Sequence, residues 1–118
     1  TAWRLFENNT LLGYATIASG QGYGGELKIM LVIDSNFKKI KGIEIIKSNE
    51  TPGLGSKISK NFFKNQFKGL DITGQIEYTK KTPSKDNQIQ TITGATISSK
   101  SVVEILNQTI EKLKTNIK

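Results

Sequence analysis

The clearest strand signal in this chain is Leu27-Lys28-Ile29-Met30-Leu31-Val32-Ile33-Asp34, in which large apolar and β-branched residues predominate. A second signal of this kind follows at residues 40–47, and its first residues alternate between apolar and polar, as in a half-exposed strand. Residues 35–39 separate the two segments, a length typical of a hairpin connection. The pair therefore predicts the centre of an antiparallel sheet, with the apolar side chains in the core.

Upstream of this pair, residues 4–18 indicate two short strands around a turn at Asn8-Asn9. Residues 19–25 then contain four glycines, too many for the interior of a strand or helix, so we expect a loop there. Two roles are open for this loop. It is either a simple turn between strands or a place where the backbone lies close to a ligand.

Downstream, residues 48–56 form a polar loop shaped by Pro52, which favours an extended conformation at Thr51 and a tight turn after it. Helical spacing predicts a short amphipathic helix over residues 57–67, with Ser56 as its N-cap. Lysines alternate with aromatic residues between positions 60 and 68. This pattern is more typical of an amphipathic helix with solvated lysines than of a nucleic-acid site. The residues expected on the spaced face are Ile58, Phe62, Phe63, Gln66 and Phe67.

The C-terminal part combines a strand at residues 75–80, a polar loop at 82–87 and a long amphipathic helix. Ser101 and Glu104 match a capping box, which predicts that this helix begins at Ser101 or one turn earlier. We predict an α+β fold: a mainly antiparallel sheet, a short middle helix and a longer C-terminal helix packed on the sheet. The apolar stripe of that helix is Val102, Val103, Leu106, Ile110, Leu113 and Ile117.

Five hydroxyls are concentrated in Thr91-Ile92-Thr93-Gly94-Ala95-Thr96-Ile97-Ser98-Ser99, just before this helix. The Gly-Ala pair in its middle leaves the backbone accessible to a ligand. A helix N-terminus favours an anion by roughly 0.3–1 kcal/mol per charge, because its backbone N–H groups are free and its dipole is positive there. The run therefore predicts either a phosphate site or a set of hydroxyls that only cap the helix and close a turn.

Composition narrows the function. A length of 118 residues is typical of one domain. The chain has 17 basic and 10 acidic side chains, and the resulting formal net charge of +7 favours binding of anionic cofactors, acidic partners or an anionic membrane surface. The chain has no cysteine and no histidine. Thiol nucleophiles, the usual zinc sites, and iron–sulfur or haem ligation by these residues are thereby excluded. Any redox chemistry must come from an organic cofactor.

The segment Thr93-Gly94-Ala95-Thr96-Ile97-Ser98-Ser99-Lys100-Ser101-Val102 resembles the flavin-attachment motif of the FMN-binding domain family. Members include the G subunit of the Rnf electron-transport complex and the C subunit of the sodium-translocating NADH:quinone oxidoreductase. Glu50-Thr51-Pro52-Gly53-Leu54-Gly55 and Gly22-Tyr23-Gly24-Gly25 also stand in the family's order, so the resemblance spans nearly the whole chain. One position departs from the pattern, because Gln90 stands where many members have an acidic residue.

The resemblance implies a cofactor and a set of site residues. The family's attachment position corresponds to Thr96, whose hydroxyl would carry FMN through a phosphoester bond, so Thr96 is an attachment site and not a catalytic base. A separate flavin transferase would install the cofactor. The other residues that the resemblance places at the flavin are Tyr23, Glu50, Thr51, Leu54, Thr93, Gly94, Ala95, Ser98 and Ser99.

The resemblance further implies an electron carrier within a membrane-bound redox complex, rather than an enzyme in its own right, with the other subunits of the complex as partners. Residues 1–118 would form one FMN-binding domain on the extracytoplasmic face of a bacterial inner membrane. Because the chain opens at Thr1 without Met, we expect a processed or truncated fragment that follows an N-terminal anchor. Two alternatives stay open: a non-redox, surface-anchored binding module of the same fold, and an enzyme that uses dissociable FMN.

Overall fold

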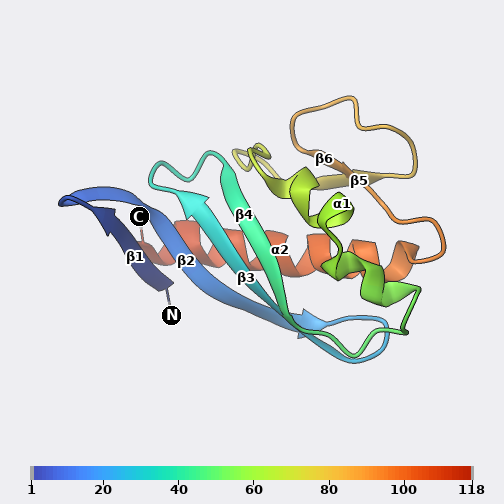
Figure 1. The fold of residues 1–118 in the computed structure, drawn as a ribbon. Helices are drawn as coiled ribbons and strands as arrows, with labels where there is room; N and C mark the ends of the chain where they lie inside the picture. Colours follow the sequence, from blue (N-terminus) through green and yellow to red (C-terminus); the bar gives the residue numbers. More distant parts are fainter. Residues whose placement is uncertain (1, 118) are drawn as a thin grey trace.

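The computed structural model describes residues 2–117, and its main feature is a four-stranded antiparallel sheet (Figure 1). The strands are β1 (Ala2–Glu7), β2 (Thr10–Gln21), β3 (Glu26–Asp34) and β4 (Ile40–Lys47), paired in chain order. The two strongest strand signals of the sequence are confirmed as β3 and β4, which pair directly. With a long C-terminal helix and short helical segments beside the sheet, the predicted α+β class is confirmed.

The N-terminal hairpin turns where the sequence predicts, at Asn8 and Asn9, which both have positive φ. Successive positive φ angles match the twist of a tight hairpin, and asparagine tolerates them better than most residues. The prediction that residues 19–25 form a loop is wrong for its first half, because β2 continues to Gln21. Gly20 lies opposite Leu27 inside the sheet, and a Cβ there would come within 2.5 Å of Ile105 Cγ1. This glycine therefore serves helix packing.

The core lies between one face of the sheet and the helix α2 (Thr96–Ile117), which runs behind the strands in Figure 1. Alternate residues of β3 on that face, such as Leu31, are fully buried. The apolar stripe of α2 is confirmed from Val102 to Leu113, while the side chain of Ile117 lies outside the described part of the chain. Ser101 does not cap the helix, because α2 begins at Thr96, more than one turn earlier. The Ser101 hydroxyl instead donates a hydrogen bond to the carbonyl of Ile97.

The predicted short middle helix is confirmed, but one continuous helix over residues 57–67 is wrong. Three short segments replace it: the 3-10 helices η1 (Gly55–Ser59) and η2 (Asn65–Phe67), with α1 (Asn61–Lys64) between them. Lys60 is extended and separates η1 from α1, and Ile58 and Phe63 on its two sides are both fully buried. Ser56 lies inside η1 instead of capping it, and Phe62 is 60% exposed.

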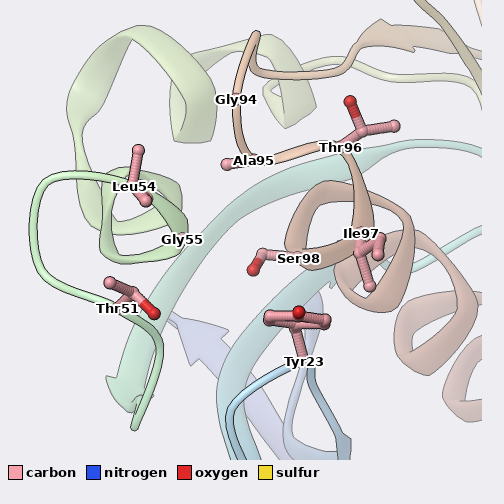
Figure 2. A pocket seen from close by; sticks show the side chains of 9 residues that line it. All are labelled: Tyr23, Thr51, Leu54, Gly55, Gly94, Ala95, Thr96, Ile97 and Ser98. Atoms are coloured by element: carbon pink, nitrogen blue, oxygen red, sulfur yellow. The ribbon is translucent and has the colours of Figure 1, made fainter.

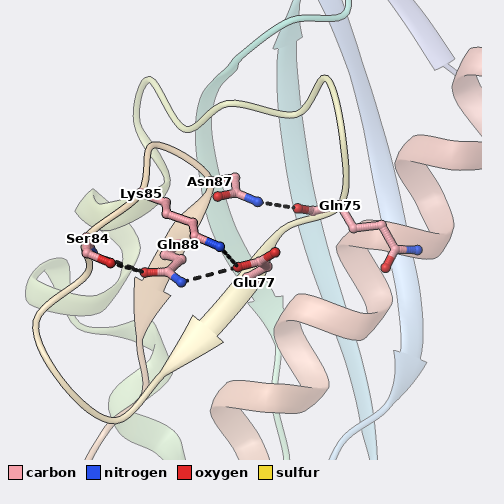
Figure 3. A network of polar contacts seen from close by, with 6 residues as sticks. All are labelled: Gln75, Glu77, Ser84, Lys85, Asn87 and Gln88. Atoms are coloured by element: carbon pink, nitrogen blue, oxygen red, sulfur yellow. Dashed lines mark hydrogen bonds and ion pairs between the residues drawn. The ribbon is translucent and has the colours of Figure 1, made fainter.

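The strands β5 (Glu77–Thr79) and β6 (Gln88–Gln90) form a separate parallel pair. The strand predicted at residues 75–80 is confirmed as β5 but is shorter, and β6 was not predicted. Side chains reinforce the pair (Figure 3): Gln88 Nε2 donates to Glu77 Oε1, and Asn87 Nδ2 donates to the Gln75 carbonyl. The hydrogen bond from Gln88 and the nearby charge of Lys85 lower the pKa of Glu77. This pair fixes the point from which the chain enters the hydroxyl-rich run.

A bilayer span needs a helix that is both long and apolar. Among residues 2–117, no helix meets both requirements.

Candidate functional site

A cavity of about 390 Å³ lies where three segments meet at one end of the sheet (Figure 2). The segments are the loop at residues 22–25, the loop at residues 48–55, and the turn that leads into α2. This volume is within the range of small-molecule pockets. The residues that line it are Tyr23, Thr51, Leu54, Gly55, Gly94, Ala95, Thr96, Ile97 and Ser98.

Exposed apolar side chains surround this cavity. Tyr23 is 68% exposed, Leu54 50% and Ile97 55%, and each comes from a different one of the three segments. Figure 2 shows Leu54 on a different loop from Tyr23, with Ile97 on the first turn of α2. Large apolar groups that gather at a hollow in this way mark a binding site more often than isolated exposed ones do. The arrangement suits a flat, largely apolar ligand.

Glu50 holds the segments of the site together from behind the cavity wall. Its Oε1 accepts hydrogen bonds from the Tyr23 amide at 2.9 Å and from Ser98 Oγ at 2.7 Å. Its Oε2 accepts one from the Gly24 amide at 2.5 Å. The side chain is buried, with 5% exposure, and each of its two oxygens accepts at least one hydrogen bond from the protein. One carboxylate thus joins the glycine loop, the proline loop and the first turn of α2.

The glycines of the two loops make this arrangement possible. A Cβ on Gly24 would lie 2.5 Å from the Asn49 carbonyl oxygen and 2.9 Å from Glu50 Oε2. A Cβ on Gly55 would lie 2.5 Å from Ser98 Oγ. All three distances are far below van der Waals contact. Gly24 and Gly55 therefore let the backbone pack closely around the buried Glu50 carboxylate. The sequence pattern alone does not indicate this reason for glycine at the two positions.

The hydroxyls of the run have different roles. Ser98 is bonded to Glu50, whereas Ser99 Oγ donates to the Ala95 carbonyl and accepts from the Ile92 amide, which fixes the turn before α2. Thr96 is half-buried at the cavity, and its hydroxyl makes no hydrogen bond to any described residue. Among the hydroxyls of this run, Thr96 therefore combines a place on the cavity wall with a hydroxyl free to react.

The electrostatics of the cavity come from the backbone. Because α2 begins at Thr96, the first N–H groups of the helix lack intrahelical acceptors and lie at the positive end of its dipole. The described residues that line the cavity include no Asp, Glu, Lys or Arg. Such a site can accept a phosphate at the helix end and an uncharged ring between the loops.

The structure brings most of the sequence-predicted site residues together. Seven line the cavity: Tyr23, Thr51, Leu54, Gly94, Ala95, Thr96 and Ser98. Glu50 and Ser99 lie behind the wall as supports, and Thr93 lines a neighbouring groove instead. The sequence analysis did not predict Gly55 and Ile97 as site residues, although both belong to the quoted motifs. Only their positions within those motifs could have indicated them, because glycine and isoleucine side chains have no reactive or hydrogen-bonding group.

An α+β domain with a small-molecule cavity at the start of its long helix belongs to the class of ligand-binding domains. The chain belongs to the FMN-binding domain family, whose model matches residues 22–111. That range begins at the glycine loop and extends into α2, so it includes all three segments that form the cavity.

Two relatives are similar over most of this chain. The G subunit of the Na(+)-translocating ferredoxin:NAD(+) oxidoreductase complex of Acetobacterium woodii is 41% identical over 107 residues, which cover 88% of this chain and 50% of the relative. The G subunit of the proton-translocating ferredoxin:NAD(+) oxidoreductase complex of Clostridium ljungdahlii is 35% identical over 109 residues, covering 92% and 57%. The chain thus spans about half the length of these relatives.

Solved structures agree with the fold. The crystal structure of the C subunit of the Na(+)-translocating NADH-quinone reductase from Parabacteroides distasonis has a TM-score of 0.80 at 30% identity, covering 92% of this chain and 57% of that one. That of NqrC from Shewanella oneidensis has a TM-score of 0.81 at 17% identity, covering 98% and 61%. The second likeness supports the fold alone.

Proposed function

We propose that this chain carries FMN as a phosphoester on Thr96 and relays electrons within a membrane-bound, ion-translocating oxidoreductase complex. The observation that carries this proposal is the free Thr96 hydroxyl, placed at the start of α2 and on the wall of a cavity with exposed apolar rims. Membership in the FMN-binding domain family supports the choice of cofactor. When bound, FMN supplies transfer of one or two electrons without a metal.

Each part of the site has a task in this proposal. Thr96 would hold FMN through an ester of its side-chain oxygen, and the first amides of α2 would stabilise the remaining phosphate charge, which the second ester bond lowers from about two negatives to one. Tyr23, Leu54 and Ile97, the exposed apolar residues of the cavity, would hold the ring by apolar contact. Glu50 positions the Tyr23 loop through its hydrogen bonds. The proposal gives the described lining residues the task of holding the cofactor and assigns them no acid–base step.

The setting is proposed from the relatives. The G subunits of two ferredoxin:NAD(+) oxidoreductase complexes are similar to this chain, and we assign it the same kind of assembly, with the other subunits as partners. We place residues 1–118 as one domain on the extracytoplasmic face of a bacterial inner membrane, behind an N-terminal anchor. A flavin transferase attaches the cofactor, because an unactivated threonine does not form the ester by itself.

The test is the intact mass of the full-length protein, isolated from its own membrane and denatured. Wild type is expected to exceed the bare chain by FMN less one water, with the increment on the Thr96 peptide. Thr96→Ala is expected to remove the increment and leave the fold intact. The matched control is Thr93→Ala, which changes the exposed threonine on the other side of the turn and is expected to keep the flavin.

Two results would contradict the proposal. Flavin released into the supernatant from a chain of bare mass would indicate dissociable FMN. Absence of flavin from native wild-type material would indicate a binding module without redox function.

A further inference from the structure

A second hollow, which we call the basic groove, lies beside the attachment turn. Its volume is about 700 Å³. Thr93 lines it, while the next residue, Gly94, lines the flavin cavity, so one turn separates the two spaces. The residues that line the groove are Lys57, Lys60, Phe62, Gln66, Gln90, Thr91, Ile92 and Thr93.

The groove carries uncompensated positive charge. Lys57 and Lys60 form no ion pair with any described residue, and the described lining contains no Asp or Glu. The nearby Lys64 differs, because it is paired with Glu44. Two free ammonium groups on one wall favour an acidic occupant, and the net charge of +7 adds attraction at longer range.

An aromatic side chain stands beside these lysines without a partner in the core. Phe62 is 60% exposed, whereas Phe63 and Phe67 of the same segment are fully buried. A large exposed aromatic residue flanked by cations is the composition of a protein-binding hot spot more than of a solvated surface. A nucleic acid would require a longer track of basic side chains than two lysines.

The wall of the groove is held in place before any partner binds. Gln66 Nε2 donates to the Gln90 carbonyl at 3.0 Å, and the Gln90 amide donates to Gln66 Oε1 at 2.7 Å. This reciprocal pair ties the short helical segments to β6. A preformed surface loses less conformational entropy on association, which favours docking.

We propose that the basic groove docks the acidic face of the protein that exchanges electrons with the flavin on Thr96. This inference rests on the proposed function, because it takes the flavin to lie across the turn. Docking at the groove would place an acidic redox partner next to the attachment segment, with Phe62 as the apolar anchor and Lys57 and Lys60 as the charged rim. Opposite charges at such a rim chiefly raise the association rate and make it depend on salt.

The test uses the full-length protein in membranes that contain the assembled complex and measures the rate of flavin reduction by the complex's electron donor. The double variant Lys57→Glu/Lys60→Glu is expected to keep a normal flavin content and to lose about tenfold in rate at low salt. The matched control, Lys38→Glu/Lys112→Glu, makes the same change in net charge at exposed sites in the β3–β4 turn and the C-terminal part of α2, and its rate is expected to fall far less than that of the groove variant. Phe62→Ser is expected to slow flavin reduction, while the rate of reduction still depends on salt concentration as in wild type.

Flavin content, measured by intact mass on every sample, separates the outcomes. Equal rates for the groove variant and its control, at equal flavin content, would overturn the docking proposal. A groove variant that lacks flavin would overturn it too, because the groove would then serve the transferase. Wild-type protein without flavin would overturn the proposed function, and the docking inference with it.

Discussion

The middle of the sheet and the end that forms the site are held together by different forces. At the middle, Ile29, Leu31 and Ile33 of β3 are fully buried in one apolar core with α2. At the site end, Glu50 and Ser99 join three loops by hydrogen bonds. Apolar burial is non-directional and shared among many contacts, whereas a buried carboxylate depends on each of its donors. The core therefore sets stability, and the site end sets local geometry.

The largest expected effect is on the core. Leu31→Ala removes a fully buried side chain from β3 and should lower the free energy of unfolding by about 2–5 kcal/mol. Val32→Ala, one residue along on the half-buried face of the same strand, is the matched control and should lose less than half as much. Denaturant unfolding followed by circular dichroism measures both. Equal losses would mean that the two faces of the sheet are equally buried.

The next largest effect on stability is expected at the Glu50 carboxylate. Glu50→Gln keeps the size of the side chain but turns a donor toward one of its backbone N–H partners, which should destabilise the fold by about 1–3 kcal/mol. Hydrogen exchange should rise at the Tyr23 and Gly24 amides while β3 stays protected. Glu104→Gln, at an exposed position on α2, should change neither quantity. Uniformly faster exchange across the sheet would contradict the separation of core and site.

A smaller effect is expected at the turn before α2. Ser99→Ala removes the acceptor of the buried Ile92 amide and should lower stability by about 1 kcal/mol. Ser101→Ala is the control, because the Ser101 hydroxyl donates to a helical carbonyl whose backbone bond survives its loss. Thermal unfolding of the two variants measures the difference. If Ser101→Ala were the more damaging change, the turn would not depend on Ser99.

The smallest effect is at a surface carboxylate away from both regions. Hydrogen bonds from the Thr73 hydroxyl and amide lower the pKa of Asp71. A lowered folded-state pKa stabilises the fold above the unfolded pKa of about 3.9, and this stabilisation is lost as pH falls through the folded value. Asp71→Asn should therefore be slightly less stable than wild type at pH 7, and the difference should shrink below about pH 4. A difference that is constant with pH would exclude ionisation as its origin.

Much of the fold followed from the sequence because its signals are local. The β-prone residues of β3 and β4, the Asn8-Asn9 turn and the helical stripe of α2 each depend on neighbours in the chain. The errors arose where tertiary packing decided. Gly20 was assigned to a loop although it lets Ile105 approach the sheet, and Lys60 breaks a helix that spacing alone would continue.

The same division holds at the site. The sequence by itself determined the hydroxyl run, its place at a helix N-terminus and the absence of cysteine and histidine, because residue types and their order are sufficient for these. Only the tertiary structure decided that Glu50 supports the cavity wall, that Thr93 faces a different groove from Thr96, and that the Thr96 hydroxyl makes no hydrogen bond to the described residues. Each of these depends on contacts between segments as much as 48 residues apart, and no local pattern encodes such contacts.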